Sequence, residues 1–258
     1  MKALWLSAAV FLFVVIGSFV FAWPAFADPT DPATPEAPSA PSVTIDVGGS
    51  TKPSTSVVAL VGLTVLAVAP SLILMVTSFT KIFVVLALTR NALALTGVPP
   101  NQVLAALALF LTIFIMQPTI SDINDQALQP YLAGSLSFTQ ALQAAEPPLR
   151  AFMGPLTRQE DIALLTRAAG LSNPANLDSV PMQTLIPAFM LSELRAAFII
   201  GFVIFIPFLV IDLVVAAILM SMGMMMLPPV MISLPFKILL FVLVDGWGLI
   251  VTQLVGSY

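Results

Sequence analysis

Residues 184–226 read TLIPAFMLSELRAAFIIGFVIFIPFLVIDLVVAAILMSMGMMM, and the only ionisable side chains in this apolar run are Glu193, Arg195 and Asp212. About 20 apolar residues are enough for a helix to cross the hydrocarbon core of a bilayer. The run is therefore predicted to hold either two membrane helices or one long kinked helix. Pro207 lies inside it and is expected to break or bend the helix.

The composition of the whole chain agrees with a membrane protein. Apolar residues make up 59% of the 258 residues and charged residues only 9%, and the mean hydropathy is +1.05. A soluble domain usually carries about 25% charged residues, because its surface must face water. We therefore expect an all-α fold, covered largely by lipid or by other apolar subunits.

Three further apolar runs flank this stretch, at residues 57–75, 103–116 and 234–255. The run at 103–116 is short for a membrane span and could be a re-entrant helix or one packed against protein. The fold prediction is one of long kinked helical hairpins: residues 57–117 form a first apolar hairpin, and residues 184–258 form a second with a methionine-rich turn.

The chain begins with features of a secretory signal peptide. Lys2 precedes an apolar stretch, and Ala25-Phe26-Ala27 provides a small-residue cleavage site. We expect residues 1–27 to be the signal, with an uncleaved signal anchor as the alternative. Residues 28–56 are rich in proline and small polar residues, so this segment is expected to be a disordered linker.

Residues 118–183 are the most polar part of the chain after the linker. Thr157 and Glu160 have the spacing of a capping box, which predicts that a helix begins there. With the mature N-terminus outside the cell membrane, the positive-inside rule places Lys81 and Arg90 on the cytoplasmic side. Residues 118–183 then return to the outside as a small extracytoplasmic helical region.

The inventory of side chains excludes several function classes. The chain has neither cysteine nor histidine, which excludes disulfides, thiolate metal sites and catalysis that needs a histidine base. The net charge of −4 comes with no basic run that could neutralise phosphates, so nucleic-acid binding is not expected. No cofactor, metal or enzymatic activity is implied.

Glu193 and Lys237 stand near the starts of two successive apolar segments. An unpaired charge in hydrocarbon costs a few kcal/mol even on the gentler insertion scales, so each needs a partner or contact with water. A helical hairpin or a neighbouring copy of the chain could bring them together. Alternatively, both side chains could reach to the membrane interface on their own.

Asp212 and Asp245 raise the alternative of an intramembrane aspartyl protease, in which two carboxylates would share a proton. The sequence around Asp245 lacks the Gly-x-Gly-Asp pattern of those enzymes. An aspartate before a glycine near a helix end is more often a cap or a charge partner, which weighs against a protease.

Methionines gather near the end of the long apolar run, at positions 220, 222, 224, 225 and 226. Methionine is flexible and polarizable, so a cluster can adapt to partners of different shape. Packing in a helix core is the simpler interpretation of such a cluster. However, Gly223, Pro228 and Pro229 are helix breakers that favour a turn, and Met224, Met225 and Met226 on that turn could form a deformable apolar gasket.

Several strings of this chain resemble the FliP family of flagellar biosynthetic proteins. They are SFTKI (78–82), PPNQV (99–103), LALFLT (107–112), SEL (192–194), GF with IFIPFL (201–209), GMMM with PP (223–229), and LPFK with FVLVDGW (234–247). The resemblance covers about residues 57–256 in the right order.

The resemblance implies a subunit of the flagellar type III export gate, in the inner membrane and the flagellar basal body. It implies a ring of several copies, thought to be pentameric, which assembles with FliQ and FliR and passes unfolded flagellar subunits. The family's methionine gasket maps onto Met224, Met225 and Met226, and its inter-subunit charge pair maps onto Glu193 and Lys237. The paralogous subunit of virulence injectisomes is the nearest alternative, and a solute or ion transporter is a more distant one.

Overall fold

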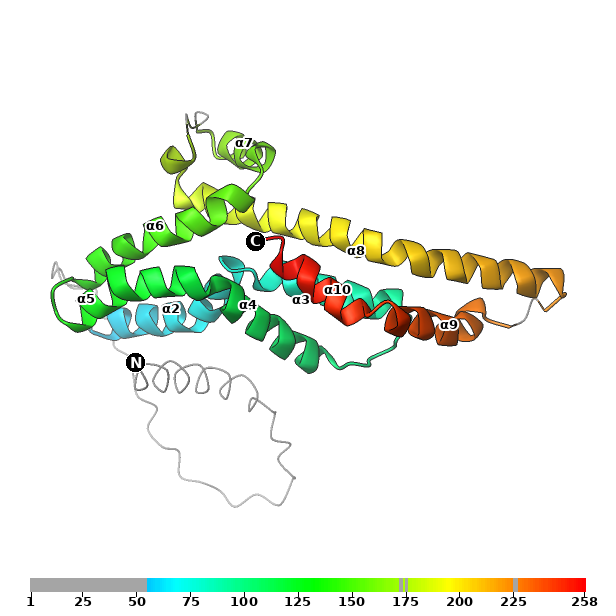
Figure 1. Ribbon diagram of the computed structural model, residues 1–258. Coiled ribbons are helices and arrows are strands. Elements are labelled where there is room, and N and C mark those ends of the chain that lie inside the picture. The colour runs from blue at the N-terminus through cyan, green and yellow to red at the C-terminus, as the bar shows by residue number, and fades with distance from the viewer. Residues whose placement is uncertain (1–54, 172–173, 175, 225–226) are drawn as a thin grey trace, which may run out of the picture. The chain divides into compact units, whose positions relative to one another are not determined.

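The computed structural model of the chain describes residues 55–171, 174, 176–224 and 227–258. The predicted signal peptide and all but the last two residues of the predicted linker lie outside the described residues. Every regular element within the described part of the chain is a helix, which confirms the all-α class. Figure 1 gives the order of these helices along the chain.

The first apolar region forms three helices. Helix α2 (Thr55–Met75) and helix α3 (Phe79–Ala92) meet at a bend of 75°. Helix α4 (Asn101–Ile123) continues through a π-helical turn (Asn124–Leu128) and α5 (Gln129–Leu132) as one helical stretch of 32 residues. This stretch is much longer than the apolar run at 103–116, so helix formation extends across the predicted domain boundary after residue 117.

The polar region forms helices α6 (Phe138–Leu156) and α7 (Gln159–Ala168) and a short 3-10 turn (Leu177–Ser179). The expected capping box of Thr157 and Glu160 is wrong. Arg158 is the N-cap of α7, and the Thr157 hydroxyl instead donates to the Met153 carbonyl oxygen. A genuine capping box starts α6, where the side chains of Ser137 and Gln140 bond to each other's backbone N–H groups.

Helix α8 (Met182–Ser221) is a single helix of 40 residues, followed by α9 (Pro229–Leu243) and α10 (Gly246–Val255). Of the two arrangements predicted for residues 184–226, the structure has the single long helix, and Pro207 does not break it. Proline is tolerated in apolar membrane helices, where neighbouring groups satisfy the carbonyl that it frees. Helices α9 and α10 meet at a bend of 60°. The turn between α8 and α9 is visible at one end of the long helix in Figure 1.

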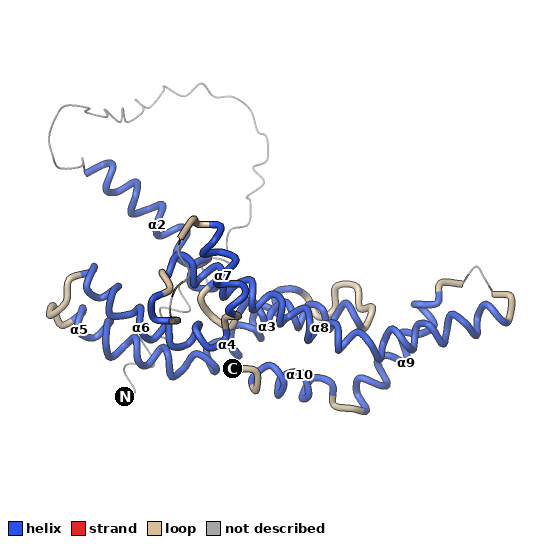
Figure 2. Tube along the Cα trace, turned by 90° about the horizontal axis from the view of Figure 1, so that it is seen from above, coloured by secondary structure: helices blue, strands red, loops and turns tan. Residues whose placement is uncertain are grey.

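Length and hydropathy make several of these helices able to cross a membrane. The stretch Asn101–Leu132 and α8 each qualify alone, and the bent pairs α2–α3 and α9–α10 qualify if each pair is one broken span. Figure 2, seen from above, shows α8 and α9 extending together as a pair. The chain is therefore an all-α protein with helices suited to a bilayer.

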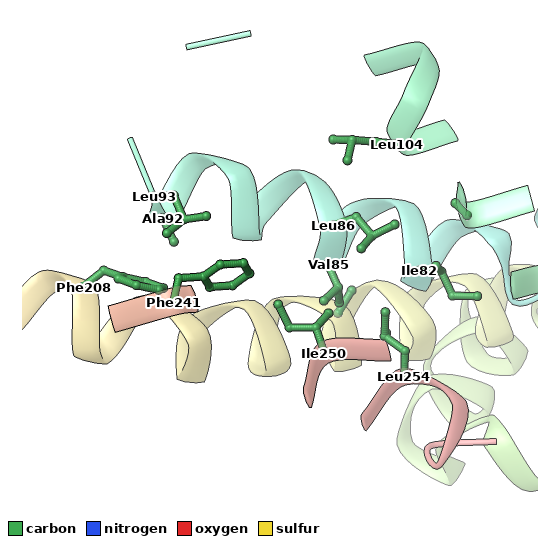
Figure 3. Packing of buried hydrophobic residues seen from close by; sticks show 12 residues of the cluster. Ile82, Val85, Leu86, Ala92, Leu93, Leu104, Phe208, Phe241, Ile250 and Leu254 are labelled. Carbon is green, nitrogen blue, oxygen red and sulfur yellow. The ribbon is translucent and has the colours of Figure 1, made fainter. Parts of the chain in front are cut away.

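The main core is centred on α3, which packs against α8, α4 and α10. Ile82, Val85 and Leu86 of α3 point toward Ile250 and Leu254 of α10 in the close-up of Figure 3. Helices α3 and α8 come unusually close at Gly201. A Cβ atom added there would lie 2.3 Å from Cδ1 and 3.2 Å from Cβ of Leu88. The missing side chain of Gly201 is therefore what allows this packing.

A second cluster joins α6 and α7 to the first turns of α8. Its buried members are Met153, Ile162, Val180, Leu185, Ala188 and Phe189. Phe189 packs edge-on against Phe152, with ring centroids 6.0 Å apart. This cluster anchors the polar region to the start of the apolar helix.

Candidate functional site: buried ion pairs and an apolar hairpin tip

Helix α8 carries a buried carboxylate, Glu193, which pairs with Lys81 of α3. The Lys81 Nζ and Glu193 Oε1 atoms are 3.1 Å apart, and each side chain is only 3% exposed. Removing two charges from water costs several kcal/mol each, so such a pair needs good geometry and further hydrogen bonds. Glu193 has one such bond at its other oxygen.

That second partner is Tyr258, which follows α10. Its hydroxyl donates to Glu193 Oε2, and the Lys81 ammonium lies 3.7 Å from the centre of the tyrosine ring. Phe152 of α6 stacks on the same ring at a centroid distance of 5.9 Å. Burial, reinforced by the charge of Glu193 and by its hydrogen bond, raises the pKa of the Tyr258 hydroxyl far above its ordinary value.

Lys237 of α9 is also buried and pairs with Asp212 of α8. Its Nζ atom lies 2.7 Å from Asp212 Oδ2 and donates to the Ala92 carbonyl oxygen at 3.3 Å. The Ser233 hydroxyl donates to Asp212 Oδ1 at 2.5 Å. This network ties the end of α3 to the α8–α9 hairpin and leaves both oxygens of Asp212 with a donor.

The structure does not bring Glu193 and Lys237 together within one chain. Each has a different partner, Lys81 for Glu193 and Asp212 for Lys237. A contact between them in neighbouring subunits stays a prediction. Sequence reasoning missed the roles of Lys81 and Tyr258. The signal for Lys81 was available, because it is a cation between two apolar runs and therefore needs a partner.

A third polar cluster fastens α7 to α8 beside Glu193. The Ser192 hydroxyl donates to Asp161 Oδ2 at 2.7 Å, and Arg195 Nη2 lies 3.2 Å from Asp161 Oδ1. The backbone N–H of Arg158 donates in turn to the Ser192 oxygen at 3.0 Å. The first part of α8 is thus held on two sides by charged groups.

The two aspartates of the protease alternative have separate roles. Asp212 is engaged with Lys237 and Ser233, whereas Asp245 is the N-cap of α10 and accepts from the Gly248 N–H at 3.4 Å. Asp245 has a left-handed conformation, with φ of 50°. The expectation that Asp245 serves as a cap is confirmed.

The hairpin beyond the Asp212–Lys237 pair has no ionisable side chain from residue 213 to 236. We call residues 213–236 the apolar tip. Gly223, with φ of +73°, and Pro228 lie in its turn, and Pro229 begins α9 as its first residue, where the missing N–H of proline costs nothing. Met224 is 41% exposed in this turn, whereas Met225 and Met226 lie outside the described residues. The gasket therefore stays a prediction.

Comparison with known proteins places this arrangement in a family. The profile of the FliP family matches residues 62–254, which include every helix from α2 to α10 in whole or in large part. The chain belongs to the FliP family. The matched region includes both buried ion pairs and the apolar tip, and it excludes the predicted signal peptide and linker.

Relatives of similar length carry the same family name. The flagellar biosynthetic protein FliP of Bacillus subtilis (strain 168) is 54% identical over 217 residues, which is 83% of this chain and 98% of the relative. The FliP of Pectobacterium carotovorum subsp. carotovorum is 50% identical, covering 81% of each chain. The FliP of Cereibacter sphaeroides is 50% identical, over 84% of this chain and 72% of the relative.

Proposed function

We propose that this FliP-family chain is a core subunit of the flagellar type III protein export gate in the bacterial inner membrane. It forms the gated channel together with further copies of itself, FliQ and FliR, and unfolded flagellar subunits pass through it. Its relatives are named flagellar biosynthetic proteins, which favours the flagellar assembly over the virulence injectisome. The chain acts by assembly and gating, without catalysis.

The apolar surface of α8 is the observation that carries this proposal. At 1.5 Å per residue its 40 residues extend over about 60 Å, roughly twice the thickness of the hydrocarbon core of about 30 Å. A tilt of about 40°, the upper end of the usual range, still leaves about 46 Å along the membrane normal. In the apolar 18-residue stretch of α8 that is suited to a membrane, only 11% is buried inside the chain. The first turns of α8 pack against α6 and α7 within the chain, and we expect further subunits to cover the exposed apolar side of the rest.

Copurification tests the assembly. The tagged chain is extracted in mild detergent together with its membrane partners, and the mass and composition of the eluted complex are measured. We expect several copies of the chain in one ring-sized complex with FliQ-like and FliR-like proteins. A chain that transports a solute in liposomes as a lone monomer would contradict the proposal.

The apolar tip is proposed to form the gasket of the channel, with Met224, Met225 and Met226 closing it to ions. Replacing all three by alanine should leave the complex assembled and raise the ion leak of cells or proteoliposomes, because smaller side chains no longer fill the opening. Met75 in α2 is a matched control, since its exposed fraction of 41% equals that of Met224. A leak that stays at the level of M75A argues against the gasket.

Glu193 and Lys237 are proposed to meet between neighbouring subunits, sharing or exchanging their partners within the chain. Reversal of one charge, as in E193K, should abolish the ring-sized complex, and K81E/E193K/D212K/K237E, which also reverses the two partners inside the chain, should restore it. The matched variant K81E/E193K restores only the pair inside one chain. The inter-subunit contact is refuted if K81E/E193K alone restores assembly, because the lysine introduced at position 193 would then face Lys237 of the neighbouring subunit without penalty.

A further inference from the structure

Tyr258 lies between a surface cleft and the buried Lys81–Glu193 pair. The cleft is formed by α4 and α6, has a volume of about 270 Å³ and is lined by Pro118, Thr119, Asp122, Pro148, Ala151, Phe152, Pro155, Leu156 and Tyr258. On its other side, the tyrosine contacts both charged groups of the pair. One side chain thus borders both the open cleft and the buried charges.

We propose that Tyr258 is a plug that closes the buried Lys81–Glu193 pair off from the cleft. Several contacts hold the plug in place: its hydroxyl on Glu193, the Lys81 ammonium over its ring, and the Phe152 ring stacked at an interplanar angle of 10°. Leu254, fully buried in the main core, anchors the turn of α10 that precedes it. The plug therefore joins α10 to three other helices.

The proposal has a physical consequence for water. A buried ion pair is stable only while its charges keep their partners, and water that reaches it lowers the strength of the attraction. With Tyr258 withdrawn, Glu193 Oε2 would lose its donor and the pair would face the cleft. The plug keeps the centre of the helix bundle dry at the bend between α2 and α3.

Ser78, in that bend, is a suitable reporter. It is fully buried, its hydroxyl has no hydrogen-bond partner among the described residues, and its carbonyl oxygen lies 3.3 Å from the Tyr258 hydroxyl. Serine and cysteine are similar in size, and the chain has no cysteine of its own. The variant S78C therefore places a single buried thiol on the residue whose backbone carbonyl contacts the plug.

The test measures the rate at which a water-soluble maleimide labels this thiol in the full chain in detergent. We expect S78C to react at least tenfold more slowly than D122C, whose thiol lies in the cleft. S78C/Y258A should approach the rate of D122C. S78C/Y258L should also gain reactivity while keeping an apolar side chain that preserves folding, because leucine does not reach Glu193.

Two controls separate the plug from a general loss of structure. S78C/Y131A removes the other tyrosine of the chain, in α5, and should stay as slow as S78C. S78C/Y258F keeps the ring and should stay protected although it loses the hydroxyl. Fast labelling of S78C alone, or slow labelling of both S78C/Y258A and S78C/Y258L, would overturn the proposal.

Discussion

Glu193 illustrates how a single buried carboxylate is satisfied in an apolar chain. Lys81 supplies the opposite charge at one oxygen, and Tyr258 supplies a neutral donor at the other. A hydrogen bond to a charged group contributes about 1.5–3 kcal/mol, a substantial fraction of the roughly 5–15 kcal/mol that separates most folded proteins from unfolding. The tyrosine therefore matters to stability as well as to access of water.

The pKa of Tyr258 gives a prediction at alkaline pH. Because its pKa in the folded chain is raised above the ordinary 10.0, the folded state keeps the proton that the unfolded state loses. The stabilisation is complete below about pH 10 and declines as the pH rises above it. Glu193 is the charged group that contacts the hydroxyl, and the Lys81 ammonium lies over the tyrosine ring.

Tyrosinate absorbance checks this expectation directly. The chain has two tyrosines, so Y131F leaves Tyr258 as the only one. We expect no tyrosinate absorbance from folded Y131F at pH 11 and a normal signal after unfolding. The unfolding midpoint of Y131F should also fall more steeply above pH 10 than that of Y131F/Y258F. A folded-state transition near pH 10 would contradict the burial of the hydroxyl.

Gly201 gives a second prediction at the residue scale. A Cβ atom there would meet three side-chain atoms of Leu88, and the cost of overpacking is about 1–3 kcal/mol. We expect G201A to lower the unfolding temperature in detergent, and G201A/L88A to recover part of the loss. Gly62 of α2 is the control, because a Cβ atom there would meet nothing within 4 Å. Equal effects of G62A and G201A would argue against the close packing.

At the scale of helices, the Lys81–Glu193 pair connects α3 to α8. Removing one partner of a buried pair costs about 3–5 kcal/mol, whereas replacing both by apolar residues is often close to neutral. K81M should therefore destabilise the chain strongly, and K81M/E193M should regain most of the loss. Unfolding midpoints in detergent measure both. If the double variant is as unstable as the sum of the single variants, the two residues do not act as a pair.

Hydropathy predicts the existence of the apolar helices well but not their lengths. The long stretch from α4 to α5 continues into polar sequence, because Pro118 and the residues after it keep helical geometry through a π-helical turn. Helix α8 continues through Pro207. Rules for proline come from helices in water, where a broken hydrogen bond is replaced by water. In an apolar setting no water is available for the backbone, so unwinding the helix at proline would leave more N–H and C=O groups without a partner than the helix does.

The partners of the buried charges were harder to predict than the charges themselves. Sequence spacing identifies Glu193 and Lys237 as costly in hydrocarbon, but it does not say which helices become neighbours. Lys81 lies 112 residues from Glu193 along the chain. Tyr258 follows the last helix and belongs to no periodic pattern, so nothing in the sequence points to it.

At the scale of the whole molecule, the exposed side of α8 should be covered on assembly. Phe202 in α8 is 69% exposed. We expect F202C to react with maleimide in the isolated chain in detergent and to be protected in the assembled complex. S135C, on the loop between α5 and α6, should react in both. Unchanged labelling of F202C in the complex would mean that no other chain covers this face.

The two ion pairs have a consequence for biogenesis. Glu193 and Asp212 lie on one helix about 28 Å apart, by the rise of 1.5 Å per residue, and each depends on a lysine from another helix. Lys81 is synthesised before Glu193, whereas Lys237 leaves the ribosome after Asp212. No one of these three helices can enter the bilayer alone without an uncompensated charge. The Lys81–Glu193 pair can therefore form as soon as α8 has been made, whereas Asp212 gains its partner only when α9 arrives.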